Sequence, residues 1–301
     1  MRIAVAATPI VAIPTLDALL ASEHELVSVI TRADAPAGRG RELQASPVAQ
    51  WAKSQNLLTY KPESASLMSE LVKDLDLVIT IGYGFIIPES ILPIPRHGFI
   101  NLHFSLLPRW RGAAPVQRAI ESGDSVTGVT VFKLDKGMDT GPIYATEQIA
   151  LSPDVNSGEL LSTLAELGVG PVLQTLNLIL ARTEPKVQSE VDATRAEKLS
   201  KEQGHIDWNL DAVAIQRKVN AFNPNPGAWS QFRGQNLKIN KVRITDQHLA
   251  RGAIDATNKS VFVGTSTFAL EILEVTPAGK STLAASAWAN GARITSTDVL
   301  N

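Results

Sequence analysis

FINLHFSLLPRWRG, residues 99–112, is the stretch that decides the interpretation of this chain. It begins as a short apolar strand, presents Asn101, His103 and Ser105 at alternate positions, and is stopped by Pro108. In an open α/β sheet, ligands bind in the crevice outside the carboxyl ends of the strands. If the strand belongs to a parallel sheet, its polar end is therefore predicted to form a functional site.

The residues before this stretch alternate between strands and helices. Residues 3–7 form a short apolar run, residues 14–20 have helical spacing with proline in the first turn, and residues 26–31 are predicted to form a second buried strand. Residues 77–81 form a run that is apolar apart from one threonine and too short for a helix, as expected of a central strand. The order predicts an α/β fold with a doubly wound, mostly parallel sheet.

The segment after the sheet residues is predicted to hold two helices. The first begins with a capping box at Asn156 and ends at Leu167, and the second runs from Val172 to Ala181. Gly168, Gly170 and Pro171 are expected to separate the two helices.

Several function classes are set aside by the sequence. Residues 6–11, after the first strand, contain no glycine, which argues against an NAD or FAD site of the G-x-G-x-x-G type. The turn at residues 135–141 lacks the spacing of a calcium loop. The 301 residues include no cysteine, which excludes disulfides, thiolate zinc sites and a cysteine nucleophile. The chain has no run of eighteen apolar residues and begins as a strand, so neither a membrane span nor a signal peptide is expected.

The chain is predicted to have two domains. An α/β domain covers residues 1–181, a polar linker covers 182–205, and a domain of short alternating strands covers 206–301. The net charge is −2, but residues 206–301 carry 10 Lys and Arg against 7 Asp and Glu. A small OB-like barrel that binds nucleic acid would fit this composition, and so would a merely solvated β-domain.

Three polar residues are expected to act together. Asn101 and His103 lie at a strand end, and Asp139 lies in the turn before the next strand. Amide and imidazole groups can donate hydrogen bonds to the oxyanion formed when an amine attacks an activated carbonyl. A carboxylate beside His103 would favour the cationic imidazole and help to take the proton from the amine. Ser105 is a poor nucleophile candidate, because the G-x-S-x-G pattern is absent.

A loop with three arginines, RADAPAGRGRE, covers residues 32–42. It could be a solvated surface loop or a mobile arm that meets phosphate groups, which guanidinium groups bind in a bidentate manner. The residues themselves leave both interpretations open.

The sequence nevertheless resembles a known family. NLHFSLLPRWRGAAP (residues 101–115) and DKGMDTG (135–141) look like the two signatures of the folate-dependent formyltransferases. Four further segments resemble the branch of that family that acts on initiator tRNA, and the resemblance covers nearly the whole chain. They are PAGRGR (36–41), SPV (46–48), AEKLSKE (196–202) and AFNP (221–224).

The resemblance implies a fold and a reaction. It implies a Rossmann-like formyltransferase domain, followed by an OB-like tRNA-binding domain. The reaction would transfer a formyl group from 10-formyltetrahydrofolate to methionyl initiator tRNA, without a metal. Apart from the resemblance, the absence of cysteine fits a reducing cytoplasm, and the absence of a long apolar edge or heptad predicts a monomer. By residue, the resemblance implies catalysis by Asn101, His103 and Asp139, folate binding by Ser105, Leu106, Leu107 and Pro108, and tRNA binding by Arg39 and Arg41.

Two departures and three alternatives accompany the resemblance. Ala7 stands where the family has glycine, and Phe104 stands where a small residue is common, so Phe104 is expected to border the folate pocket and narrow it. The alternatives are a sugar-nucleotide N-formyltransferase, a formyltetrahydrofolate hydrolase, and an RNA-binding module without chemistry.

Overall fold

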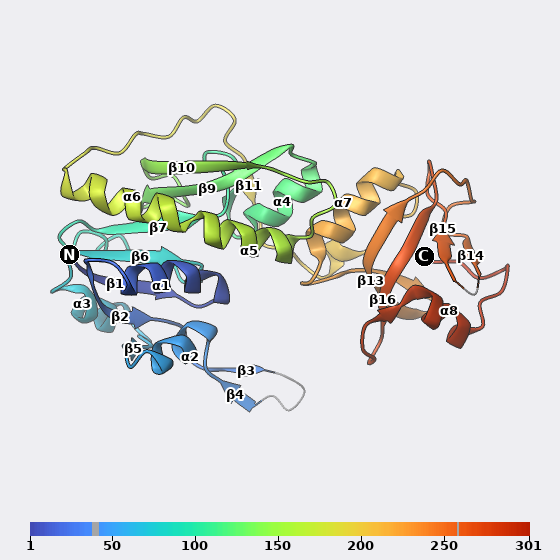
Figure 1. Ribbon diagram of the computed structural model, residues 1–301, viewed down its shortest axis with the longest axis horizontal. Helices are drawn as coiled ribbons and strands as arrows, with labels where there is room; N and C mark the ends of the chain where they lie inside the picture. The colour runs from blue at the N-terminus through green and yellow to red at the C-terminus, as the bar shows by residue number, and fades with distance from the viewer. Residues whose placement is uncertain (38–41, 258) are drawn as a thin grey trace. The chain divides into compact units, whose positions relative to one another are not determined.

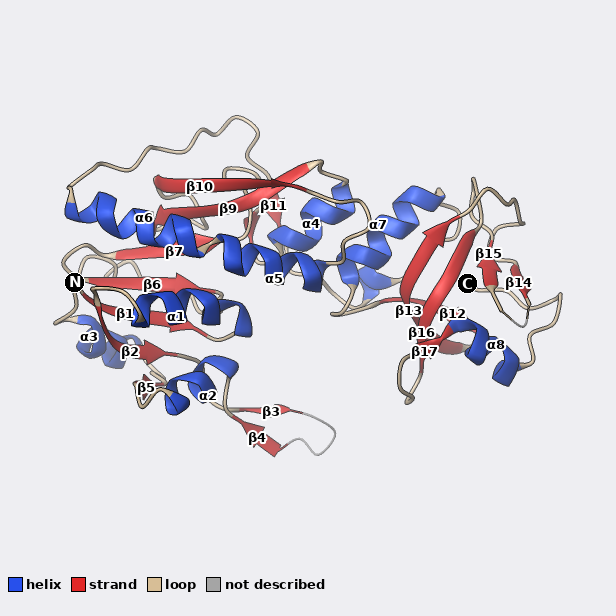
Figure 2. Ribbon diagram, viewed as in Figure 1, coloured by secondary structure: helices blue, strands red, loops and turns tan. Residues whose placement is uncertain are grey.

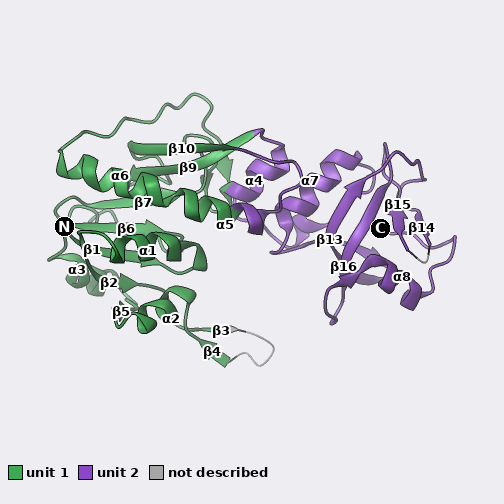
Figure 3. Cartoon of the chain, viewed as in Figure 1, with its two compact units in different colours: residues 1–115, 126–149, 161–196 green, residues 116–125, 150–160, 197–301 purple. Residues whose placement is uncertain are grey.

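The structure is a computed structural model that describes residues 1–37, 42–257 and 259–301. The chain divides into two compact units (Figure 3). Unit 1 contains Met1–Pro115, Val126–Ile149 and Leu161–Ala196, and unit 2 contains Val116–Ser125, Ala150–Leu160 and Glu197–Asn301. The predicted domain boundaries at residues 181 and 205 stay a prediction.

Unit 1 is built on a seven-stranded sheet with the order β10-β9-β7-β6-β1-β2-β5 (Figure 1). Strands β5, β2, β1, β6 and β7 run parallel, whereas β9 runs antiparallel to β7. The strands are β1 (Arg2–Ala7), β2 (Glu25–Ile30), β5 (Leu58–Tyr60), β6 (Leu77–Ile81), β7 (Phe99–His103), β9 (Val126–Lys133) and β10 (Ile143–Ala150). The chain moves outward from β1 through β2 and then returns to the other side of β1, so the strand order reverses between β1 and β6.

Helices cover both faces of this sheet (Figure 2). On one face, α6 contacts α1 and β9. On the other, Met68 and Val72 of α3 join a buried cluster with Ala4, Val78 and Phe99 of the sheet. The helices of unit 1 are α1 (Ile13–Leu20), α2 (Pro47–Ser54), α3 (Ala65–Val72) and α6 (Val169–Leu180). Helix α5 (Ser157–Leu167) begins in unit 2 and ends in unit 1, and α4 (Pro115–Ser122) lies in unit 2 apart from its first residue. The predicted doubly wound, mostly parallel α/β fold is confirmed.

Helices α5 and α6 follow each other with almost no break, contrary to the expected gap. Helix α6 begins at Val169 rather than Val172, because Pro171 lies in its first turn, where proline is tolerated. Residues Ser157–Leu180 are long and apolar enough to cross a membrane by length and composition alone. Burial in the protein core also explains their apolar character, since Leu164, Val172 and Leu176 are fully buried.

Short paired segments complete unit 1. Strands β3 (Ala35–Ala37) and β4 (Glu42–Gln44) pair antiparallel, on either side of the residues that are not described. Strands β8 (Arg111–Gly112) and β11 (Arg195–Ala196) pair parallel. This second pairing joins the signature stretch to a segment about eighty residues later in the chain.

Unit 2 contains an antiparallel sheet with the order β12-β13-β16-β15-β14, and β17 pairs with β16. Helix α7 contacts β13, and α8 contacts β16. The bounds are α7 (Ala212–Phe222), β12 (Ala228–Phe232), β13 (Gln235–Ile244), β14 (Ile254–Ala256), β15 (Val261–Val263), β16 (Leu270–Pro277), β17 (Leu283–Ala284) and α8 (Ala285–Ala292). The curled sheet agrees with the small β-domain predicted for the end of the chain.

Candidate active site

Strand β7 places Asn101 and His103 at the carboxyl end of the parallel sheet. Because side chains alternate along a strand, both residues project from the same face of β7. On the neighbouring strand β6, Thr80 lies in register with Asn101, and its hydroxyl donates a hydrogen bond of 2.7 Å to Asn101 Oδ1. This bond orients the amide with its oxygen toward Thr80, which turns the NH₂ group to the other side.

The His103 imidazole is buried, with 7% of its side chain exposed, and one of its ring nitrogens is hydrogen-bonded while the other faces a carboxylate. Its Nε2 lies 2.9 Å from the carbonyl oxygen of Trp110, and since a carbonyl can only accept, Nε2 carries the proton. Its Nδ1 lies 3.8 Å from Asp139 Oδ2. The ring is therefore oriented with one nitrogen toward the backbone and the other toward a carboxylate.

Trp110 in turn is fixed by a residue far along the chain. Its backbone has a positive φ of 66°, and its N–H donates a hydrogen bond of 2.9 Å to Thr194 Oγ1. Thr194 also accepts from the N–H of Arg111 through its carbonyl oxygen. The orientation of His103 thus depends on Trp110, and that of Trp110 on Thr194.

Asp139 lies in the turn between β9 and β10. Its carboxylate Oδ2 accepts a hydrogen bond of 2.7 Å from the N–H of Gly112. The backbone of Asp139 has a φ of 54°, in the left-handed region that aspartate tolerates better than most residues. The structure therefore brings His103 and Asp139 together, as the sequence analysis expected, with Asn101 two residues from His103.

The expected folate-binding residues Ser105, Leu106, Leu107 and Pro108 form a tight turn after β7. The Ser105 side chain is 1% exposed, and its hydroxyl donates a hydrogen bond of 2.7 Å to the carbonyl oxygen of Arg109. The hydroxyl is thus used inside the turn, and Leu107 is also buried. Phe104, the departure from the family pattern, is 8% exposed and lies in the interior.

The loop after β6 adds an apolar surface at the carboxyl edge of the sheet. Phe85 and Ile86 are 53% and 82% exposed, which is unusual for such side chains. The Arg32 guanidinium lies 4.8 Å from the centre of the Phe85 ring, and the Tyr83 ring meets Phe85 edge to face. Burial raises the pKa of the Tyr83 phenol, although Arg32 opposes this shift. An exposed aromatic ring beside a sheet edge suits a flat heterocyclic ligand.

Arg39 and Arg41, the residues expected to bind tRNA, lie outside the described residues. Within the described ranges, no group of three or more His, Cys, Asp and Glu residues is arranged to hold a metal ion.

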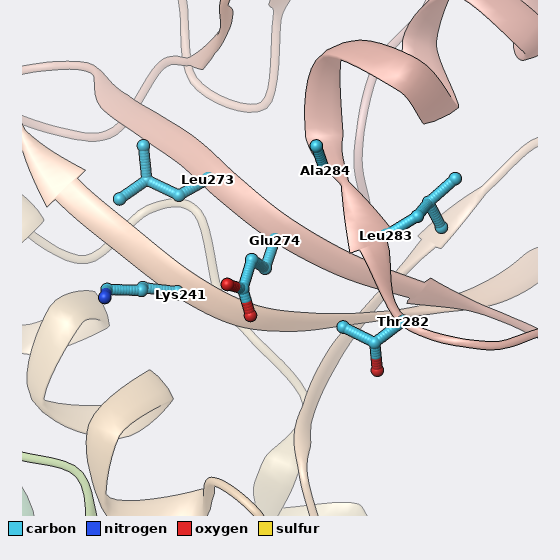
Figure 4. Close-up of a pocket in the computed structure, with 6 residues that line it drawn as sticks. All are labelled: Lys241, Leu273, Glu274, Thr282, Leu283 and Ala284. Atoms are coloured by element: carbon cyan, nitrogen blue, oxygen red, sulfur yellow. The ribbon is translucent and has the colours of Figure 1, made fainter.

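A separate hollow lies on the sheet of unit 2 (Figure 4). It is lined by Lys241, Leu273, Glu274, Thr282, Leu283 and Ala284. Lys241 and Glu274 are opposite each other on β13 and β16. None of the residues expected in the active site lines this hollow.

Sequence analysis missed the residues that support the site. Thr80 belongs to an otherwise apolar strand, and Gln188 and Thr194 belong to a segment interpreted as a linker. Gln188 is buried and donates hydrogen bonds to the carbonyl oxygens of Asp139 and Gly141. No periodicity or motif distinguishes these residues in the sequence.

Comparison with known protein families assigns the protein with this fold and site to one class. Residues 1–176 match the family described as Formyl transferase, and residues 198–293 match the family described as Formyl transferase, C-terminal domain. The chain belongs to the formyltransferase family.

One relative supports this assignment by its sequence, and two solved structures are similar in fold. The methionyl-tRNA formyltransferase of Pseudarthrobacter chlorophenolicus is 44% identical over 97% of both chains. HypX from Aquifex aeolicus, solved in complex with tetrahydrofolic acid, has a TM-score of 0.70 at 20% identity; the match covers 96% of this chain and 47% of HypX, so this chain spans about half of that protein. An N-formyltransferase from Helicobacter canadensis, in complex with folinic acid and dTDP-3-aminofucose, has a TM-score of 0.69 at 17% identity, covering 90% and 98%. The two solved structures share the fold.

Proposed function

We propose that this protein transfers the formyl group of 10-formyltetrahydrofolate to the amino group of methionyl initiator tRNA. The product is N-formylmethionyl-tRNA, which is used to initiate translation. The observation that carries the proposal is the His103–Asp139 pair, 3.8 Å apart at the end of a central strand. It occurs in a chain that is 44% identical over nearly its whole length to a methionyl-tRNA formyltransferase.

In this proposal, the catalytic residues are Asn101, His103 and Asp139. As the amine attacks the formyl carbon, negative charge develops on the formyl oxygen. The Asn101 amide donates a hydrogen bond to it, and so does the Nδ1–H of a protonated His103, whose Nε2 is already bonded to the Trp110 carbonyl oxygen. One such donor contributes about 3 to 4 kcal/mol to a transition state of this kind. Asp139 stabilises positive charge on His103 and helps to take the proton that the amine releases. The folate nitrogen leaves and takes up a proton, which completes the transfer.

Bound folate would supply the activated formyl group. The turn from Ser105 to Pro108 follows β7 directly, and Phe85 and Ile86 in the loop after β6 are exposed, so the carboxyl edge of the sheet offers apolar surface for such a ligand. The Ser105 hydroxyl contributes through the turn that it stabilises. The donors named above act without a metal ion, and the proposal includes none.

The tRNA would be held by basic residues outside the catalytic residues. Arg39 and Arg41 are assigned to contact with the phosphates of the acceptor end, and the domain from residue 206 onward is assigned to the body of the tRNA, because it carries an excess of basic residues. Arg39→Ala and Arg41→Ala should each weaken tRNA binding and lower the slope of log K against log salt by about 1. An unchanged slope would count against phosphate contact. We further propose that the protein acts as a monomer, in the cytoplasm and away from membranes.

The direct experiment offers formyl-labelled donor to separate acceptors. The proposal predicts label on methionyl initiator tRNA and little on methionyl elongator tRNA. Label on an amino-sugar nucleotide instead would identify a sugar N-formyltransferase, the kind of activity that the Helicobacter canadensis protein's ligands indicate for that protein. Release of formate without tRNA would identify a hydrolase, and binding of tRNA without any transfer would identify an RNA-binding module.

A further inference from the structure

Gln188 is a buried amide in which all the polar atoms are engaged. The residue is 8% exposed. Its Nε2 donates to the carbonyl oxygens of Asp139 and Gly141 at 2.9 and 2.7 Å. Its Oε1 accepts from Arg111 Nε and Nη2 at 3.1 and 2.9 Å. An amide has two N–H donors and one oxygen with two lone pairs, so these four hydrogen bonds use its full capacity.

These bonds join strand β8 to the turn that carries Asp139, one of the proposed catalytic groups. Arg111 is next to Gly112, whose N–H donates to the Asp139 carboxylate. Gln188 then connects the Arg111 side chain to the backbone of Asp139 itself. Strand β8 and the Asp139 turn are therefore linked twice, once through the Asp139 carboxylate and once through Gln188, which comes from a different part of the chain.

The hydrogen bond from Gln188 holds the backbone at a residue with an unfavourable conformation. Asp139 has a φ of 54°, a conformation that costs free energy and persists only when its surroundings hold it. The carbonyl oxygen that Gln188 binds belongs to this same residue. A change in the turn would move the carboxylate away from its position 3.8 Å from His103 Nδ1.

We propose that Gln188 is a positioning residue for catalysis, which fixes the Asp139 carboxylate against His103 without touching either substrate. The proposal rests on the function proposed above. A displacement of a catalytic group by about 1 Å can lower the rate by about 10²-fold. The loss of Gln188 should therefore reduce turnover much more than it reduces substrate binding.

Two variants remove the link in different ways. Gln188→Glu keeps an acceptor for Arg111 but turns a carboxylate toward the two carbonyl oxygens, and Gln188→Met has similar length without any hydrogen bond. Each should lower kcat by about 10- to 100-fold, with KM for both substrates within about threefold of wild type. The control is Val187→Ala, because Val187 is 89% exposed on the same segment and should leave kcat unchanged.

A double-mutant cycle distinguishes positioning from a general loss of stability. Since Gln188 acts through Asp139, adding Gln188→Met to Asp139→Asn should lower kcat by no more than about twofold beyond Asp139→Asn alone. Effects that multiply would overturn the proposal, as would Gln188→Met with kcat near that of wild type. If Gln188→Glu fails to fold, Gln188→Met is assessed by the same criteria. If the wild-type enzyme formylates no tRNA, the proposed function is refuted instead. The assay of the wild type, run before the variants, distinguishes this outcome.

Discussion

Replacement of Asp139 by asparagine removes one charge from the site and little else. Asparagine can accept the hydrogen bond from the N–H of Gly112 through its side-chain oxygen, and it tolerates the positive φ of 54° as aspartate does. The melting temperature should therefore stay within about 2 °C of wild type. What is lost is the attraction between the carboxylate and positive charge on His103.

The size of this loss follows from the distance between the two side chains. At 3.8 Å, opposite unit charges attract by about 4 kcal/mol at an effective dielectric constant of about 20. The two side chains are 7% and 15% exposed, so solvent screens the pair only in part. Since each 1.36 kcal/mol is about a factor of ten in rate, kcat should fall by about 10²- to 10³-fold.

The assay is steady-state formyl transfer to methionyl initiator tRNA, with KM measured for both substrates. Both KM values should remain close to wild type, because the carboxylate acts on the reacting groups. Asp139→Ala is the comparison, since it also loses the hydrogen bond from Gly112 and should be less stable. A kcat for Asp139→Asn within about threefold of wild type would refute the role assigned to the charge.

Three further predictions test the surroundings of the site and the stability of the fold. Thr80→Val removes the hydrogen bond that orients Asn101 and should lower kcat by about tenfold at unchanged KM, as steady-state kinetics would show. Gly112→Ala should lower stability by about 1 to 3 kcal/mol in a denaturant titration, because φ is 126° and the new Cβ would stand 2.6 Å from a backbone oxygen; wild-type stability would contradict this. Hydrogen bonds from Arg233 hold the pKa of Asp298 well below its usual value. The ionised Asp298 therefore stabilises the folded protein above pH about 4, and this contribution is lost as pH falls through the lowered pKa. Asp298→Asn should thus lower the melting temperature at pH 7, with a difference from wild type that narrows below pH about 4; a constant difference would contradict the assignment.

The sequence predicted the sheet and the main catalytic candidates because both depend on local patterns. Apolar runs separated by helical segments define a doubly wound sheet, and β7 was identified from its apolar start and polar end. Asn101 and His103 follow from their position at that end. Their link to Asp139 was expected from the chemistry of the three side chains, and the structure shows His103 and Asp139 within 3.8 Å.

The supporting residues could not be predicted, because they depend on pairing between distant segments. Gln188 and Thr194 lie in a polar stretch whose composition is that of a linker, yet Thr194 precedes β11, which pairs with β8. Such a pairing of two residues per strand leaves no periodic signal in the sequence. The start of α6 was also misplaced, because glycines and proline near Val169 are typical of a break and are equally compatible with a first helical turn.

The central claim is that the residues at the end of β7 carry out the transfer of the formyl group. The most direct test compares the single-turnover rate of formyl transfer to methionyl initiator tRNA in wild type and in His103→Ala, with the Kd for the tRNA measured in parallel. The account predicts rapid transfer by wild type, a rate at least about 10²-fold lower for His103→Ala, and Kd values within about threefold of each other. Transfer by His103→Ala at the wild-type rate, or no transfer by the wild type, would contradict it.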